Sequence, residues 1–325
     1  MPGFTTHYIF GMKAYNDMPF TPFKHTIAQY RWLYPLGLQG PDMFFYNIPI
    51  LRHRDYRNVG SYMHEHKVNA FFECCLRRIG TIRSRQQQEE AISYLAGFIN
   101  HYIADSICHP YVYGRIGYPV DAPTSMHHGM HAHLENELDA ILLWKYKKKK
   151  PSEFNQTATI CLNGQEIQFI SHFLASCINE TYYPITYRNN FQVTPAMVHR
   201  SIWALRFGCR TLSDKNGKKK FGIAQVESIF VNHPVASAKM VTDSVTDYRS
   251  SCNLNHEAWG NPWDPTRVST ASFVDLFHET LDKCSRVYAL LNSAVTDNMP
   301  LDKQDLSPLL TELGNESYHS GLPVD

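Results

Sequence analysis

The chain has 325 residues, a formal net charge of +1, 43% hydrophobic and 13% aromatic residues, and 17 histidines. This length accommodates one large or two ordinary domains, and the near-neutral charge excludes a strong bulk attraction to nucleic acid or anionic membranes. The first thirty or so residues hold no basic-then-apolar leader and no long apolar run follows, so we expect no secretion signal, no transmembrane segment and a cytoplasmic location. The eight scattered cysteines indicate reduced thiols.

The first segments predict a helix followed by a tight loop. Thr5 or Thr6 can cap a helix over residues 6–17, which places His7 in its first turn. In the loop that follows, a Gly-Pro pair sets Asp42 on a turn between aromatic residues. Asp42 is therefore either a structural turn residue or an acid presented for chemistry.

A second helix is predicted over residues 61–79, where apolar residues recur at intervals of three and four. His64 lies one turn before Val68 and so belongs to the buried face. Ser84 and Gln87 then resemble a capping box that opens the next helix.

That next helix is strongly apolar and carries a polar stripe over residues 91–110, AISYLAGFINHYIADSICHP. His101, Asp105 and His109 are spaced by four residues and therefore share one face. Imidazole and carboxylate are zinc ligands, and one rigid helix can supply several of them. The alternative is a pair of buried histidines that hydrogen-bond to a carboxylate.

A fourth helix is predicted over residues 126–150, and its buried stripe includes His131 and Glu135. The lysines at 147–150 are either a solvated helix end that complements the macrodipole or a contact for anionic lipid. In the loop 111–125 before this helix, Tyr111, Tyr113 and Arg115 are expected at the rim of a cleft. Arg52 and Arg54 are expected at the same rim, where arginines could bind phosphate.

The remainder of the chain predicts further helices with little chemistry. Residues 152–169 are expected to form a small hairpin or loop with its turn at Asn163-Gly164. Helices are expected over 196–212 and 272–295, with Trp259 and Trp263 between them as packing anchors. The predicted fold is an all-α multi-helix bundle. We divide it into a metal-binding core at 1–150, an additional helical region at 151–297 and a polar, flexible tail at 298–325.

Five of these segments resemble, in order, the motifs of the zinc-dependent phospholipases C and the related S1/P1 nucleases, and the resemblance covers residues 1 to about 145. The sequence looks closest to an intracellular bacterial branch of the phospholipase C family. The segments are TTHYIFG, QGPDMFFYN, MHEHKVNAFF, YLAGFINHYIADSICHPYVY and HAHLENELDAI.

The resemblance implies a trinuclear zinc site enclosed by the bundle. It implies a first zinc, bound by Asp42, His64, His101 and Asp105, and a second zinc, bound by His109, His131 and Glu135. It also implies a third zinc, bound by His7, by Asp105 as a bridging ligand and by the amino terminus. In the secreted relatives a terminal tryptophan supplies that amine, whereas here the position falls on Pro2, which becomes terminal if Met1 is removed.

The activity implied is hydrolysis of a phosphodiester by a zinc-bridged hydroxide, with Asp42 as a candidate general base. The substrate is expected to be a phosphate ester, with phospholipid at a membrane surface as one source. The first alternative is a nuclease, nucleotidase or phosphatase of the S1/P1 type, which requires aromatic side chains for base stacking. The second is a non-catalytic protein with structural zinc, although structural sites are usually closed and rich in cysteine.

Overall fold

The computed structural model describes residues 3–47, 58–186, 189–212, 214, 218–230, 237, 240–243, 245 and 247–325, with the backbone alone for 226–230. The α-helices in this part of the chain are α1 (Phe4–Asp17), α2 (Pro22–Gln29), α3 (Leu33–Gly37), α5 (Val59–Glu65), α6 (Val68–Thr81), α7 (Arg85–Arg115), α8 (Ser125–Lys147), α9 (Gly164–Tyr182), α10 (Pro195–Thr211), α11 (Lys218–Phe230), α12 (Tyr248–Ser251), α13 (Phe273–Thr296) and α14 (Ser307–Leu313). The 3₁₀ helices are η1 (Gly40–Tyr46), η2 (Pro151–Glu153) and η3 (Gln156–Thr159), and the strands are β1 (Trp259–Asn261) and β2 (Asp264–Ser269).

The predicted all-α fold is confirmed. Strands in the described part of the chain form a single two-stranded antiparallel sheet, β1 with β2. Among the same residues, no helix is both long enough and apolar enough to cross a membrane.

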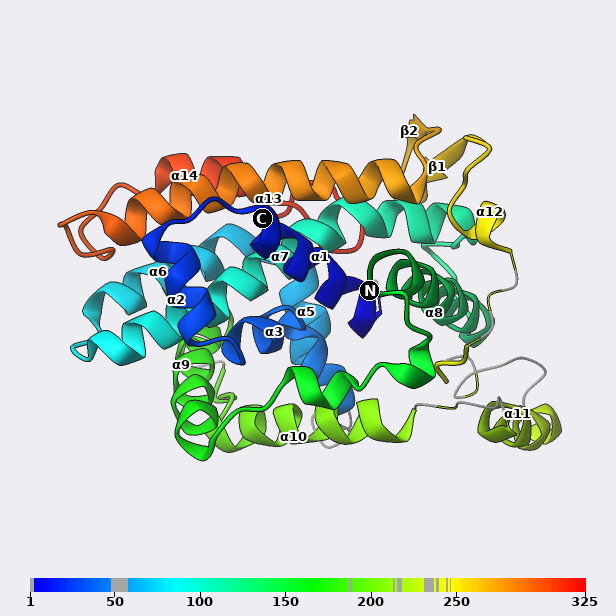
Figure 1. Cartoon of the computed structure of the whole chain (residues 1–325), viewed down its shortest axis with the longest axis horizontal. Helices are drawn as coiled ribbons and strands as arrows, with labels where there is room; N and C mark the ends of the chain where they lie inside the picture. Colours follow the sequence, from blue (N-terminus) through cyan, green and yellow to red (C-terminus); the bar gives the residue numbers. More distant parts are fainter. Residues whose placement is uncertain are drawn as a thin grey trace.

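The long helix α7 is the central element, and most other helices pack around it (Figure 1). Helix α3 approaches α7 closely because each of the two helices has a glycine at the contact. A Cβ atom on Gly97 would lie 2.1 Å from the carbonyl oxygen of Tyr34, and one on Gly37 would lie 2.0 Å from that of Tyr94. This close approach places the chain that leads into η1 directly against the middle of α7.

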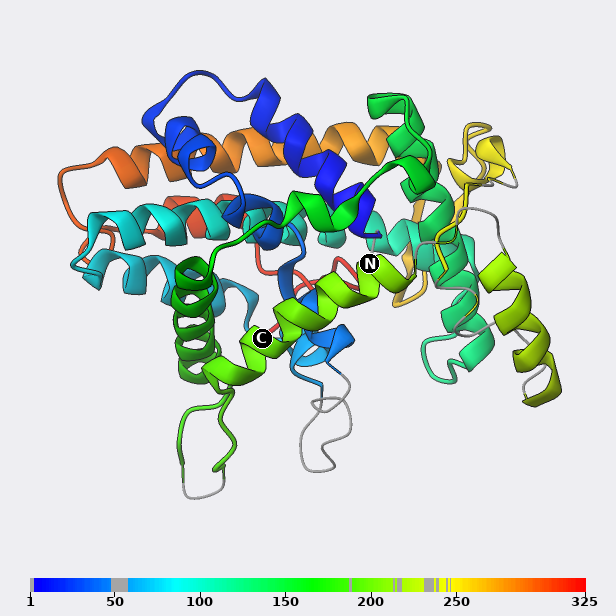
Figure 2. The same cartoon turned by 60° about the horizontal axis from the view of Figure 1, so that its bottom comes forward.

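Helix α10 packs against η1 from the outside and crosses the front of the molecule in Figure 2. The side chain of Asn47, just after η1, donates hydrogen bonds to the carbonyl of Met197 at 3.1 Å and to the hydroxyl of Ser201 at 2.9 Å. These bonds hold the segment that carries Asp42 between α10 and α7.

Three predicted boundaries were wrong. The helix predicted over 61–79 is two helices, α5 and α6, because Lys67 adopts a left-handed conformation with φ of 49° between them. Helix α7 continues through Pro110 to Arg115 instead of ending in a loop. Asn163 caps α9 through a capping box with Glu166. The predicted turn residues Asn163-Gly164 therefore begin a helix and do not form a hairpin turn.

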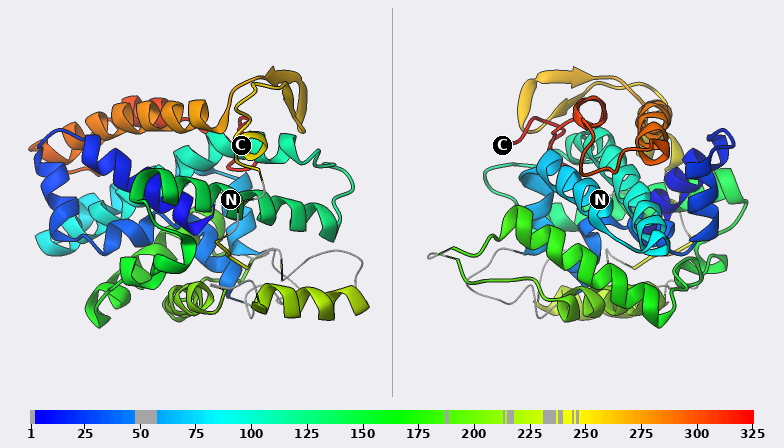
Figure 3. Two further views of the ribbon diagram at one scale, coloured as in Figure 1. Left: turned by 45° about the vertical axis from the view of Figure 1, so that its right-hand side comes forward. Right: turned by 90° about the vertical axis from the view of Figure 1, so that its left-hand side faces the viewer.

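The last 28 residues differ from the expected flexible tail because they carry apolar side chains that pack. They include α14, whose Leu313 is fully buried, and Tyr318, which is 1% exposed. Figure 3 shows this red segment leaving α14 and running past the cyan helices. The backbone N–H of Tyr318 donates a hydrogen bond to the carbonyl of His64 at 2.9 Å. The end of the chain therefore reaches the predicted metal-binding region.

Candidate metal centre

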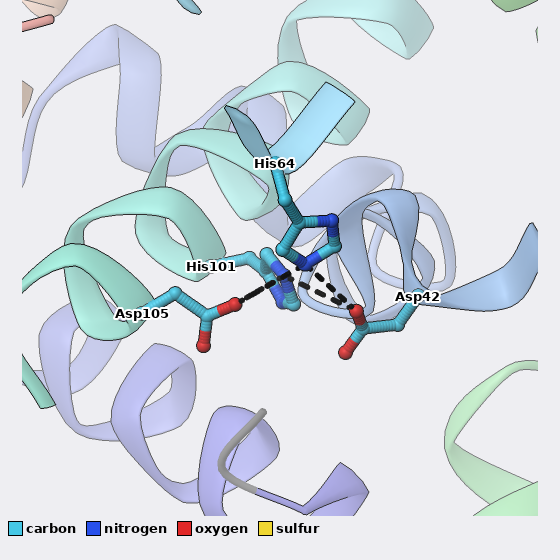
Figure 4. A group of neighbouring side chains, drawn as sticks. All are labelled: Asp42, His64, His101 and Asp105. Atoms are coloured by element: carbon cyan, nitrogen blue, oxygen red, sulfur yellow. Dashed lines mark ion pairs between the residues drawn. The ribbon is translucent and has the colours of Figure 1, made fainter. Parts of the chain in front are cut away.

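Four of the predicted ligands converge from three elements (Figure 4). They are Asp42 from η1, His64 from α5, and His101 and Asp105 from α7. All four are buried, and each offers one ligand atom within 4.8 Å of the other three. We call these residues the first group.

The distances within the first group are those expected around a small cation. The Nε2 atom of His64 lies 3.3 Å from Oδ1 of Asp42, and Nε2 of His101 lies 3.1 Å from Oδ2 of Asp105. Ligand atoms about 2.0–2.2 Å from a tetrahedral zinc lie about 3.3–3.6 Å from one another. The other two nitrogen-to-oxygen distances, from His64 to Asp105 and from His101 to Asp42, are 3.7 and 3.9 Å, so the four ligand atoms surround a space of about the size that one zinc ion needs.

His109, His131 and Glu135 form the second group, in which α7 faces α8. The Oε1 atom of Glu135 lies 2.7 Å from Nε2 of His131 and 3.6 Å from Nε2 of His109. Three ligands leave one tetrahedral position for water or substrate, as in catalytic zinc sites.

His7 lies beside the first group on the buried face of α1. Its Nε2 atom is 3.1 Å from Oδ1 of Asp105, whereas Oδ2 of the same carboxylate faces His101. This arrangement allows Asp105 to contribute one oxygen to each of two ions. Pro2, the remaining predicted ligand, lies outside the described residues.

The ring of each of three candidate histidine ligands is oriented by a backbone carbonyl. Nδ1 of His64 lies 2.7 Å from the carbonyl of Gly60, Nδ1 of His101 lies 3.1 Å from that of Leu38, and Nδ1 of His109 lies 2.6 Å from that of Tyr318. A carbonyl can only accept, so each Nδ1 carries a proton, and in the neutral ring each Nε2 presents its lone pair. Nε2 is the atom that faces the neighbouring carboxylates.

Several of these buried atoms have no hydrogen bond among the described residues. They include Oδ1 of Asp42, both carboxylate oxygens of Asp105, and Nε2 of His7, His64, His101 and His109. Buried polar groups are almost always hydrogen-bonded, and exceptions need an explanation such as an ion. The donor set is all imidazole nitrogen and carboxylate oxygen, which suits zinc.

Burial and charge set the protonation states of the metal-free centre. Burial lowers the pKa of His131 well below its ordinary 6.5 and raises the pKa of Glu135 well above 4.5. Burial also opposes protonation of His64, but the carboxylates of Asp105 and Asp42 outweigh it and raise its pKa to about 9. A bound cation would supply the positive charge that protons supply in its absence.

The family model for zinc dependent phospholipase C matches residues 6–186 of this chain. The chain belongs to the zinc-dependent phospholipase C family. The match includes every candidate ligand except Pro2, and it extends past position 145, where the sequence resemblance ended, to include α9. No curated protein and no solved structure matches the chain at a significant level.

Some residues expected at the rim of the phospholipase C-like centre lie elsewhere. Tyr111 is fully buried and packs on Trp259, so it does not line a cleft. Arg115 sits on the last turn of α7 and pairs with Glu257 at 3.0 Å. Of the three expected rim residues that the structure describes, Tyr113 lies beside the centre, since its ring centroid lies 4.5 Å from that of His131. Arg52 and Arg54 lie outside the described residues.

Two features of the centre were missed by the sequence prediction. The first is the C-terminal segment, where the ring centroid of His319 lies 4.9 Å from that of His64 and 5.7 Å from that of His109. It lies in a polar stretch without helical periodicity, so no sequence signal marked it. The second is Asp139, one turn after Glu135 on α8; its place on the same buried stripe was an available signal.

Asp139 caps the helix that carries His7. Its Oδ1 accepts a hydrogen bond from the backbone N–H of Thr6 at 2.7 Å, and its Oδ2 accepts one from that of Thr5 at 3.1 Å. The expected caps, Thr5 and Thr6, are therefore the residues that are capped. A carboxylate at a helix N-terminus is favourable, so Asp139 fixes α1 to α8 across the metal centre.

We expect Asp139 to make stability depend on pH. Burial raises its pKa from 3.8 to about 6, so the folded protein holds a proton that the unfolded chain has already lost between these values. This contribution to stability is present below pH 3.8 and is lost as pH rises through about 6. Between pH 4.5 and pH 7 the free energy of unfolding of the zinc-free wild type should fall by about 2 kcal/mol relative to that of Asp139→Asn, because each pKa unit of difference is worth about 1.4 kcal/mol. Urea unfolding of both proteins measures this, and a pH-independent difference would contradict it.

Proposed function

We propose that this chain is a zinc-dependent phosphoric ester hydrolase that cleaves phosphodiesters in the manner of a phospholipase C. The observation that carries the proposal is the convergence of two groups of imidazole and carboxylate side chains, in the first of which buried ligand atoms make no hydrogen bond to any described residue, in a chain of this family. Two groups of ligands within one centre favour a phosphoryl substrate, whose charge is spread over several oxygens. Non-catalytic structural zinc is less consistent with the three-ligand second group, because structural sites are closed.

In the proposed centre the first group binds one ion, the second group binds another, and His7 with Asp105 and the amino terminus binds a third. Zinc bound there would lower the pKa of water and neutralise charge on the phosphoryl group during in-line attack. Asp42 would be the candidate general base, because a carboxylate beside the bound water can accept its proton. The carbonyls behind His64, His101 and His109 keep these ligands in one tautomer throughout the reaction.

A nuclease of the S1/P1 type is the second candidate, and an aromatic cluster beside the second group favours it. Trp263 lies edge-on to Tyr113, with ring centroids 4.9 Å apart, and stacks on Tyr118 at 5.9 Å. All three side chains are partly exposed, and Tyr113 adjoins His131. Such a cluster could stack a base or cover a lipid headgroup. In this proposal Trp263 would contact substrate in addition to packing on Tyr113 and Tyr118, the packing role that the sequence predicted for it.

A panel of phosphoesters distinguishes these functions. The purified protein, with zinc content measured, is assayed on phospholipid micelles, p-nitrophenyl mono- and diesters, and single-stranded DNA. We expect release of a phosphorylated headgroup from lipid and slower cleavage of the diester. Preferential cleavage of DNA that falls in Trp263→Ala would favour the nuclease, whereas a fully metallated protein inactive on every ester would contradict both.

We propose a cytoplasmic location for the protein, as expected from its sequence. All eight cysteines lie in the described part of the chain and are free thiols. Free thiols are usual in reducing compartments. The substrate would then be lipid of an inner leaflet, a soluble phosphate ester or nucleic acid.

A further inference from the structure

The segment 315–321 lies against the metal centre although it follows the matched family region by more than a hundred residues. We call it the C-terminal strap. Residue Tyr318 within it is 1% exposed, and its ring centroid lies 4.8 Å from that of His64 and 5.9 Å from that of His101. The strap therefore covers ligands of the first group directly.

The strap is anchored at both of its ends. The phenol of Tyr102 donates a hydrogen bond to the carboxylate of Glu316 at 2.5 Å and accepts one from the N–H of Glu316 at 3.0 Å. At the other end, Asn261 of β1 donates a hydrogen bond to the carbonyl of Ser320 at 2.8 Å. Three separate elements, α7, α5 and β1, thus fix the path of its backbone.

Gly321 packs directly against α7 at Ser106 and Pro110. Pro110 has no N–H to donate to the carbonyl of Ser106, one turn earlier, and the strap packs at this position. Gly321 has a φ of 62°, and a Cβ atom there would lie 2.6 Å from that carbonyl oxygen and 3.0 Å from Cγ of Pro110. Any side chain at Gly321 would push the strap away from α7.

The strap also supplies the carbonyl that orients His109. The partners of His64 and His101 come from the matched family region, at Gly60 and Leu38. The partner of His109, the carbonyl of Tyr318 at 2.6 Å, comes from 209 residues further along the chain. Groups that orient a metal ligand typically change metal affinity by about 10–100-fold when they are lost.

We propose that the C-terminal strap is part of the metal centre, and that the Tyr318 carbonyl positions His109 so that the second group binds its ion tightly. This inference rests on the proposed function only in its assignment of the second group to zinc. Tyr318 is a positioning residue and takes no part in the chemistry. The strap makes the region beyond the family match necessary for full metal occupancy.

Two variants test this proposal through metal binding. One is a chain that ends at Gly314, and the other is the full chain with Gly321→Ala, which keeps the strap but displaces it. In each we expect the zinc ion of the second group to bind about 10–100-fold more weakly, with the first-group ion retained. Zinc titration against a chromophoric chelator and the absorption spectrum of the cobalt-substituted protein report this, with circular dichroism as the check on folding.

The control is Gly117→Ala, because Gly117 has a φ of 60° but nothing within 4 Å of an added Cβ. It imposes the backbone strain of Gly321→Ala without the collision, so its zinc affinity should match the wild type. His109→Ala provides a second check. If the strap acts through His109, adding Gly321→Ala to His109→Ala should weaken zinc binding no further.

Wild-type zinc affinity in a folded Gly314-terminated chain would overturn the proposal, as would equal losses in Gly321→Ala and Gly117→Ala. Independent, additive losses from Gly321→Ala and His109→Ala would overturn it as well. A wild type that binds zinc at both groups but cleaves no phosphoester would contradict the proposed function alone, because the titration does not depend on turnover.

Discussion

Asp105→Asn is expected to remove zinc and hydrolytic activity together. The carboxylate is fully buried, and its two oxygens face His7 on one side and His101 on the other at 3.1 Å. Asparagine keeps the volume but loses the negative charge and one ligand oxygen. Metal-ion stabilisation of transition-state charge is worth several kcal/mol, so kcat/KM should fall by about a thousand-fold or more.

Glu90→Gln is the matched control for this variant. Glu90 is a buried carboxylate near the N-terminal end of the same helix, and it accepts a hydrogen bond from Gln86. It should keep wild-type zinc content and activity. Metal analysis and steady-state kinetics on a diester provide both readouts. Full zinc content in Asp105→Asn would show that this residue does not bridge ions.

Gly40→Ala is expected to have the second large effect. Gly40 has a φ of 46°, and a Cβ atom there would lie 2.2 Å from Cδ2 of His101. The left-handed conformation alone costs about 1–2 kcal/mol for a residue with a side chain. The collision displaces either His101 or the turn that carries Asp42. We therefore expect the free energy of unfolding to fall by about 3–5 kcal/mol in total, and we expect the variant to lose the first-group zinc.

Gly117→Ala separates these two causes, because it has the same kind of backbone strain and no collision. It should lose only about 1–2 kcal/mol. Urea unfolding and zinc analysis of the two variants measure the difference. Equal losses of stability, with zinc retained in both, would mean that Gly40 does not pack on a metal ligand.

The convergence of the ligands could be predicted because each one lies in a strong local pattern. His101, Asp105 and His109 repeat every four residues on an apolar helix, and His131 and Glu135 do the same on the next. Burial of these faces against one another is what brings the polar atoms together. The all-α class and the family follow from the same segments and are confirmed.

The supporting contacts could not be predicted, because they depend on tertiary packing. Nothing local marks the carbonyl of Tyr318 as the partner of His109, which precedes it by 209 residues. Pro110 predicts a helix end, yet α7 continues because the surrounding packing outweighs the loss of one hydrogen bond. The cap of α1 comes from Asp139 on α8. The residues at the start of α1 carry no sign of this, and they favoured Thr5 or Thr6 as the cap.

Zinc content of the protein as first purified, without added metal or chelator, tests the central claim most directly. Two buried groups of ligands predict at least two zinc ions per chain, with a third if the amino terminus joins His7 and Asp105. Inductively coupled plasma mass spectrometry on the folded protein gives the number. Two or more zinc ions per chain would support the centre described above, and a content near zero would contradict it.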